Sequence, residues 1–349
     1  MPAGERAPVA VVTGGSAGVG RATVRELAGR GYDVGVVARG RAGLAGAVDD
    51  VRAAGARGLA VPADVADHEA LRRAARTIEE ELGEIRVWVN VAFVGSLAFA
   101  WDTPLAEVRR ITEVTYYGQV HGTLTALETM RPRNRGVIVN VGSAMAFRSI
   151  PLQAAYCGAK HAVKGFTEAV ATELRHERSS VRLCQVQLPG LNTPQFNWNA
   201  SRMPGHPMPV APVFQPEVAA RAIAFLAEHP RRTLWVGLST AYTILGERLA
   251  ASAVSAFLGR TGVRAQQTDA ELPRWGSNLF EPRDDEVDRG AHGPFDGTAH
   301  ARDPMLWLSV HRAPCWPERP PSPPRPPEPP PCSADAAEHH SADEGGNPA

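Results

Sequence analysis

Residues 9–20 read VAVVTGGSAGVG, a short apolar run followed by a glycine-rich turn. Val9–Thr13 has the composition of a buried strand, and a helical pattern begins near Gly18. Glycines at such a junction let a pyrophosphate approach the backbone, and the N-terminus of the helix offers unpaired N–H donors. The stretch therefore predicts a dinucleotide-binding turn. A plain tight turn between strand and helix is the alternative.

Strands and helices continue to alternate over the first 240 residues. Continuous apolar runs are typical of parallel strands covered on both faces. We therefore predict an α/β fold, a Rossmann-type doubly wound parallel sheet in a single domain with a C-terminal extension. The predicted strands are Val9–Thr13, Asp33–Ala38, Gly58–Val61, Arg86–Val91, Gly136–Gly142, Val181–Leu188 and Thr233–Val236, and the predicted helices cover 18–30, 41–54, 67–82, 104–130, 153–178 and 216–229.

The chain divides into three predicted regions. Residues 1–250 form the dinucleotide-binding domain, and residues 251–315 form an extension with a short helix at Ala251–Leu258. Residues 316–349 are rich in proline, which prevents helix and central strand, so a disordered tail is predicted there.

Residues 191–215 interrupt the alternation with a long segment rich in Met, Pro and aromatic residues. Loops of this length inside a domain are usually functional or disordered. The composition favours a lid over an apolar pocket, with a loosely packed surface loop as the alternative.

Composition excludes several classes of protein. Lys plus Arg and Asp plus Glu both number 37, so bulk charge favours neither a nucleic acid nor a membrane surface as partner. The four cysteines have no CxxC spacing, which indicates neither a disulfide framework nor a metal site. No apolar stretch is long enough to span a bilayer, and too few residues precede Val9 for a signal peptide. We expect a cytoplasmic protein.

Tyr156 and Lys160 lie four residues apart, which places them on one face of a helix, and Ser143 lies thirteen residues before the tyrosine. The chain has thirty-five arginines and only two lysines. Burial can tune the charge of a lysine but not that of an arginine. A lysine retained here indicates acid–base chemistry. The alternative is an ordinary amphipathic helix.

Together these motifs resemble the classical short-chain dehydrogenase/reductase family. The turn has the TGxxxGxG spacing of that family, and the resemblance covers about residues 8–240. It implies that Tyr156 exchanges a proton with the substrate oxygen, that Lys160 lowers the Tyr156 pKa and binds ribose, and that Ser143 orients that oxygen. It also implies a set of cofactor-binding residues. These are Thr13, Gly14, Ser16, Gly18, Val19, Gly20, Arg39, Asp64, Val65, Asn90, Ala92, Tyr156, Lys160, Pro189, Gly190 and Thr193.

Two motifs depart from the family pattern. The family motif Asn-Asn-Ala-Gly reads Asn90-Val91-Ala92-Phe93 here. Thr115 stands where the family has an Asn that helps to hold a water in its proton relay. A threonine hydroxyl reaches less far than that amide. The relay is therefore either slower or lost, with Thr115 as the candidate for positioning the water.

The residues after the second strand bear on the cofactor. An acidic residue at this position binds the ribose 2′-hydroxyl of NAD. Ala38 stands there, followed by Arg39, whose guanidinium suits a 2′-phosphate. We therefore predict NADP(H) in preference to NAD(H). Alternatively, Arg39 caps a loop or stacks on the adenine of either cofactor.

The expected substrate is a lipophilic ketone or secondary alcohol. The candidate pocket residues are largely apolar: Phe93, Met145, Phe147, Pro151, Phe196, Trp198 and Met203. Two other functions remain open: a dinucleotide-binding regulatory or scaffold protein with little turnover, and a sugar-nucleotide epimerase or dehydratase. The resemblance also implies a homo-oligomer formed through the helices that carry Thr115 and Tyr156.

Overall fold

The computed structural model describes residues 7–311. The tail predicted for residues 316–349 lies outside these residues, as do residues 312–315 of the predicted extension.

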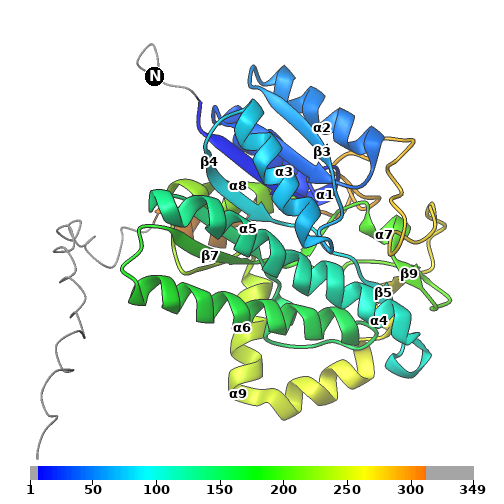
Figure 1. Cartoon of the computed structure of the whole chain (residues 1–349). Coiled ribbons are helices and arrows are strands. Elements are labelled where there is room, and N and C mark those ends of the chain that lie inside the picture. Colours follow the sequence, from blue (N-terminus) through cyan, green and yellow to red (C-terminus); the bar gives the residue numbers. More distant parts are fainter. Residues whose placement is uncertain (1–6, 312–349) are drawn as a thin grey trace, which may run out of the picture. The chain divides into compact units, whose positions relative to one another are not determined.

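Seven parallel strands form the main sheet, in the order β12-β7-β6-β4-β1-β2-β3 (Figure 1). The bounds are β1 (Val9–Thr13), β2 (Asp33–Ala38), β3 (Gly58–Pro62), β4 (Ile85–Asn90), β6 (Val137–Val141), β7 (Arg182–Gln187) and β12 (Thr233–Trp235). The strand order reverses between β1 and β4, and ligands of open α/β sheets bind at the carboxyl ends of the strands beside such a reversal. The predicted fold class is confirmed.

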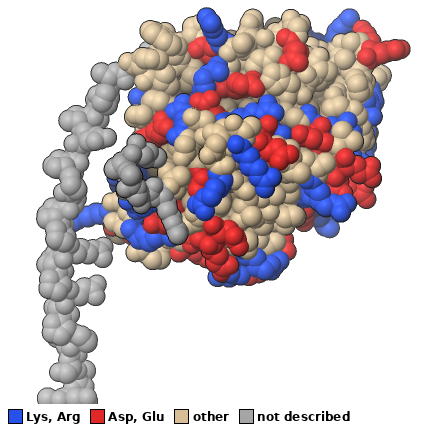
Figure 2. All heavy atoms as spheres, turned by 90° about the horizontal axis from the view of Figure 1, so that it is seen from above, with Lys and Arg blue, Asp and Glu red and all other residues tan. Residues whose placement is uncertain are grey.

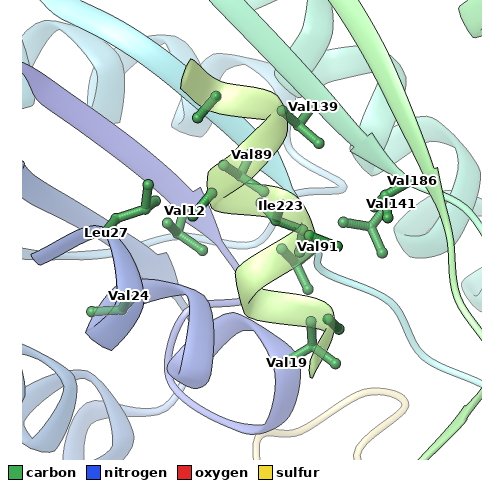
Figure 3. Packing of buried hydrophobic residues seen from close by; sticks show 14 of the residues in the cluster. Val12, Val19, Val24, Leu27, Val89, Val91, Val139, Val141, Val186 and Ile223 are labelled. Atoms are coloured by element: carbon green, nitrogen blue, oxygen red, sulfur yellow. The ribbon is translucent and has the colours of Figure 1, made fainter. Parts of the chain in front are cut away.

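Helices cover both faces of this sheet, and the strand side chains alternate between them. Val12 belongs to the cluster that contains Leu27 and Ile223, from α1 and α8 (Figure 3). Its neighbour Val11 belongs to the other cluster, with Met130 of α5. Burial on both faces explains the continuous apolar runs. The large helices are α1 (Gly18–Gly29), α2 (Arg41–Ala53), α3 (His68–Glu81), α5 (Gly118–Arg133), α6 (Ala154–His176) and α8 (Pro216–Glu228).

The helix predicted at 104–130 is interrupted. It consists of α4 (Leu105–Thr112), a π-helical turn at Glu113–Tyr117 and then α5. Such turns are rare and often lie at functional sites. This one contains Thr115.

The segment predicted as a lid carries short elements of its own. They are β8 (Gly190–Leu191), α7 (Gln195–Trp198), β9 (Ala200–Ser201), β10 (His206–Pro207) and β11 (Val213–Phe214). β11 pairs with β8, and β9 pairs with β5 (Ser96–Leu97), which follows β4. These pairings hold the segment beside the carboxyl ends of the sheet strands.

The residues after β12 return to the dinucleotide-binding half of the sheet. Helix α9 (Leu238–Thr261) passes the predicted boundary at residue 250 with a kink at Ala250, so the short helix predicted there is its second half. β13 (Gln267–Thr268) then pairs with β10, and the chain passes beside α7 to the start of α2. The last element of the described residues is α10 (Pro304–His311) (Figure 1).

Charges of both signs are interspersed on the face drawn in Figure 2. Within residues 7–311, no helix is long and apolar enough to cross a membrane. The same residues contain no group of three His, Cys, Asp or Glu side chains placed to hold a metal ion.

Candidate active site

The glycine-rich turn is shaped by close backbone approaches. Gly14 has φ +69°, and a Cβ there would lie 2.7 Å from the Cα of Ala92, beyond the end of β4. A Cβ on Gly20 would overlap the carbonyl oxygen of Gly14. Gly18 has φ +56° and begins α1, which has no side-chain cap. The turn is thus a cradle that only glycine permits, open to a ligand at the helix N-terminus.

A cavity runs along this turn, and most of the predicted cofactor residues line it. They are Gly14, Ser16, Gly18, Val19, Gly20, Arg39, Asp64, Val65, Ala92 and Thr193. A second cavity shares the walls formed by Val19, Val91, Phe93 and Thr193. Ser143, Tyr156, Lys160, Pro189 and Gly190 line this second cavity. The structure therefore brings the dinucleotide motif and the Tyr–Lys–Ser set to adjoining cavities.

Two predicted cofactor residues lie behind these walls and line neither cavity. The Thr13 hydroxyl accepts from Val91 N (3.2 Å) and donates to Val89 O (3.4 Å), so it joins β1 to β4. Fully buried Asn90 accepts from the Trp88 indole (2.8 Å) and donates to Asn140 (2.8 Å). Both residues fix the strand ends that carry the site.

Thr115 is also fully buried and lines neither cavity. Its hydroxyl donates to Val94 O (2.9 Å) and accepts from Val94 N (3.1 Å). The π-helical turn thus clamps the chain just after β4. The hydroxyl proton of Thr115 is therefore already used in the hydrogen bond to Val94 O.

Tyr156 and Lys160 project from α6 beside Ser143, which lies just after β6. Lys160 is 1% exposed, its Nζ donates to Val141 O (2.7 Å), and it lies 5.7 Å from the centroid of the Tyr156 ring. Ser143 and Tyr156 line the same cavity, and the Ser143 hydroxyl accepts a hydrogen bond from Met145 N (3.2 Å). Phe93 packs edge-on against Tyr156, with 5.7 Å between ring centroids.

Burial dominates the ionisation of this pair. It raises the pKa of Tyr156 above its usual value, against a smaller opposite effect of the nearby Ser143 side chain. Burial also lowers the pKa of Lys160 to about 7. The family resemblance implies that the lysine charge lowers the Tyr156 pKa, whereas burial raises it.

The lowered lysine pKa makes a testable prediction for stability. The unfolded chain holds the Lys160 proton up to about pH 10.5, whereas the folded chain releases it near pH 7. Between these values the unfolded state binds more protons, so wild type gains stability relative to Lys160→Met as pH rises, by up to about 1.4 kcal/mol per pH unit. Chemical denaturation of both proteins from pH 6 to 10 measures this difference. A difference independent of pH would mean that Lys160 stays charged when buried.

Arg39 and Asp64 line the first cavity, but both already have partners. The two Nη atoms of Arg39 donate to the carbonyl oxygens of Asn278 (2.6 Å), Phe280 (3.0 Å) and Leu279 (3.4 Å). Asp64 forms an ion pair with Arg110. The residues that engage Arg39 belong to the C-terminal extension.

The extension supplies cavity residues that the sequence analysis missed. Asn278, Pro282, Arg283 and Asp284 line the first cavity. They lie in an irregular segment about 240 residues from the strand end that they contact. In the sequence, the one sign of these residues is that Ala38 stands where an acidic residue is common. This does not indicate which other part of the chain supplies a carboxylate.

The second cavity is largely apolar. Of the predicted pocket residues, Phe93, Met145 and Phe196 line it. Trp198 lines the first cavity, whereas Phe147, Pro151 and Met203 line neither. The predicted lid also contributes residues that were not predicted, namely Met208, Pro209 and Val210.

Comparison with known protein families shows which family these motifs belong to. Residues 8–203, more than half of the chain, match the model of the short chain dehydrogenase family. This chain belongs to the short-chain dehydrogenase family. The match covers the glycine-rich turn and the Tyr–Lys–Ser set, and it ends before the extension that engages Arg39.

Similar proteins come from several different organisms. The uncharacterized oxidoreductase YxnA of Bacillus subtilis is 32% identical over 234 residues, which are 66% of this chain and 65% of that protein. A 3-oxoacyl-[acyl-carrier-protein] reductase of Bos taurus is 32% identical over 50% of this chain and 73% of its own length. The crystal structure of a short-chain dehydrogenase from Streptomyces avermitilis is 28% identical, with a TM-score of 0.60, and covers 73% of this chain and 96% of that one. The chain thus spans just under two thirds of the Bacillus relative.

Proposed function

We propose that the protein is an NAD(P)(H)-dependent oxidoreductase that interconverts a carbonyl group and a secondary alcohol. One observation carries the proposal: the cavity lined by Ser143, Tyr156 and Lys160 adjoins the cavity along the glycine-rich turn. A reacting carbon beside Tyr156 is then within reach of the ligand of the turn.

The turn fits the dinucleotide that the family implies. Gly14 and Gly20 leave no room for a side chain, and the N-terminus of α1 favours a pyrophosphate. Ser16, Gly18 and Val19 would hold it, and Val65, Ala92 and Thr193 line the same cavity. A nicotinamide dinucleotide supplies hydride exchange with the reacting carbon.

The residues of the second cavity divide the proton chemistry. The Tyr156 phenol gives a proton to the carbonyl oxygen in reduction and removes it from the alcohol in oxidation. Ser143, which lines the same cavity, donates to the same substrate oxygen where charge develops. Lys160, when protonated, favours the phenolate from 5.7 Å. Loss of the Lys160 charge above its pKa of about 7 would weaken this support.

Thr115 has a positioning role in this proposal. Its hydroxyl holds Val94, which places Phe93 against Tyr156. The same observation supports the second candidate function, a dinucleotide-binding protein with little turnover, because the Thr115 proton is not available to a relay water.

The cofactor preference and the substrate are the finer parts of the proposal. Arg39 taken alone predicts NADP(H), but that preference requires Arg39 to release the carbonyl oxygens of the extension, so the proposal takes either dinucleotide. The apolar lining of the second cavity favours a lipophilic ketone or secondary alcohol. A cytoplasmic location and a homo-oligomer stay predictions.

The test is consumption of NADH or NADPH, followed at 340 nm against a panel of hydrophobic ketones and diketones. The proposal expects turnover that is lost in Tyr156→Phe. Dinucleotide binding without turnover across the panel would favour the second candidate function instead.

A further inference from the structure

In the proposed function, the lining of the cofactor cavity determines whether NAD(H) or NADP(H) binds more tightly, and the inference rests on that function. In dinucleotide folds an acidic residue at the end of the second strand binds the ribose 2′-hydroxyl, whereas an arginine accommodates a 2′-phosphate. Here β2 ends at Ala38, and Arg39 follows. The strand itself therefore supplies no carboxylate.

Asp284 of the extension places a carboxylate at this position. It is 6% exposed, lines the cofactor cavity and lies over Gly40 and Gly43, where a Cβ on either glycine would overlap the carboxylate oxygens. This carboxylate forms no hydrogen bond or ion pair with another residue in 7–311. A buried carboxylate without partners is costly, so one that borders a cavity points to a ligand that donates hydrogen bonds.

Backbone contacts fix Asp284 in place. In the first turn of α2, Arg41 N donates to the Asp285 carboxylate (3.0 Å), and Ala42 N and Gly43 N donate to the carbonyl oxygens of Asp285 (3.1 Å) and Asp284 (2.9 Å). N–H groups at a helix N-terminus are the donors that a phosphate would use. Here these N–H groups already donate to Asp284 and Asp285 of the extension.

The extension also engages the arginine that the sequence analysis assigned to the phosphate. Both Nη atoms of Arg39 donate to the backbone carbonyl oxygens of residues 278–280. Bidentate recognition of a phosphate needs that end of the guanidinium. The N–H groups at the start of α2 and the Arg39 guanidinium, both suited to a 2′-phosphate, are therefore occupied. The Asp284 carboxylate, which would repel a phosphate, lies beside them.

We propose that Asp284 binds the ribose hydroxyls of the adenosine half and thereby makes the protein selective for NAD(H) over NADP(H). The adjacent Arg283 is the alternative residue that could contact the 2′ position of the ribose. It lines the same cavity, its Nε donates to Ser277 O (2.8 Å), and its Nη2 lies 3.8 Å from Glu281. If Arg283 binds a 2′-phosphate, the preference is reversed.

The test is fluorescence titration of the full chain with NADH and with NADPH, which needs no substrate. Wild type is expected to bind NADH at least about tenfold more tightly. Asp284→Asn keeps the size of the side chain and removes its charge, so NADH affinity should fall by about tenfold or more and the two affinities should become similar. Asp269→Asn is the matched control. Asp269 is exposed and lies outside both cavities, so the affinity ratio should stay as in wild type.

Thermal melting of each variant shows whether it is folded. The ratio of the NADH and NADPH affinities of wild type is measured without any variant. Tighter binding of NADPH than of NADH, lost in Arg283→Ala, would overturn the inference. An unchanged ratio in folded Asp284→Asn would also overturn it. These outcomes leave the proposed function standing. If neither dinucleotide binds, the proposed function and the inference both fail.

Discussion

Replacing Tyr156 with phenylalanine is expected to lower turnover by about 10²–10⁴-fold, the usual contribution of a positioned general acid or base. The phenol lies in the second cavity with Ser143, whereas the glycine-rich turn lies in the adjoining cavity. Dinucleotide affinity should therefore change little. Steady-state rates at 340 nm, with titration of the reduced dinucleotide, separate the two effects.

Tyr242→Phe is the control for this variant, because Tyr242 is 54% exposed on α9 and lies outside both cavities. Its rates should match wild type. Turnover that survives in Tyr156→Phe would remove Tyr156 from the mechanism.

The second large effect is expected for Gly20→Ala. The new Cβ would overlap the carbonyl oxygen of Gly14, so either the turn or the start of α1 must move. Overpacking of this kind costs about 1–3 kcal/mol of stability. A displacement near 1 Å in a binding turn can cost about a hundredfold in function. We expect dinucleotide affinity to fall by that order, as measured by titration.

Gly29→Ala is the matched control on the same helix, since the Cβ that it adds has no neighbour within 4 Å apart from the adjoining residues and the nearby backbone of the helix. It should bind the dinucleotide like wild type and be no less stable. Equal dinucleotide affinities for the two variants would show that the turn is not the binding element.

The fold was predictable because its signals are local. Several strands, Val9–Thr13 among them, are largely apolar runs, since helices cover both faces of the sheet. The Tyr156–Lys160 spacing likewise needs only helical periodicity to place both side chains on one face. The structure brings them to the predicted cavity.

Contacts distant in the sequence were not predictable. Nothing near Arg39 indicates that residues 278–280 engage it, because they belong to an irregular segment without a motif. Motif matching placed Asn90 in the cofactor set, whereas its side chain lies in a buried polar network. The direction of the Tyr156 pKa depends on the loss of solvation, which the spacing of residues does not reveal.

The most direct test of the account is fluorescence titration of the full-length protein with NADH and NADPH. The account predicts saturable binding of a reduced dinucleotide, with NADH the tighter ligand. Binding of neither dinucleotide at millimolar concentration would contradict the assignment of the glycine-rich cavity, and with it the proposed oxidoreductase.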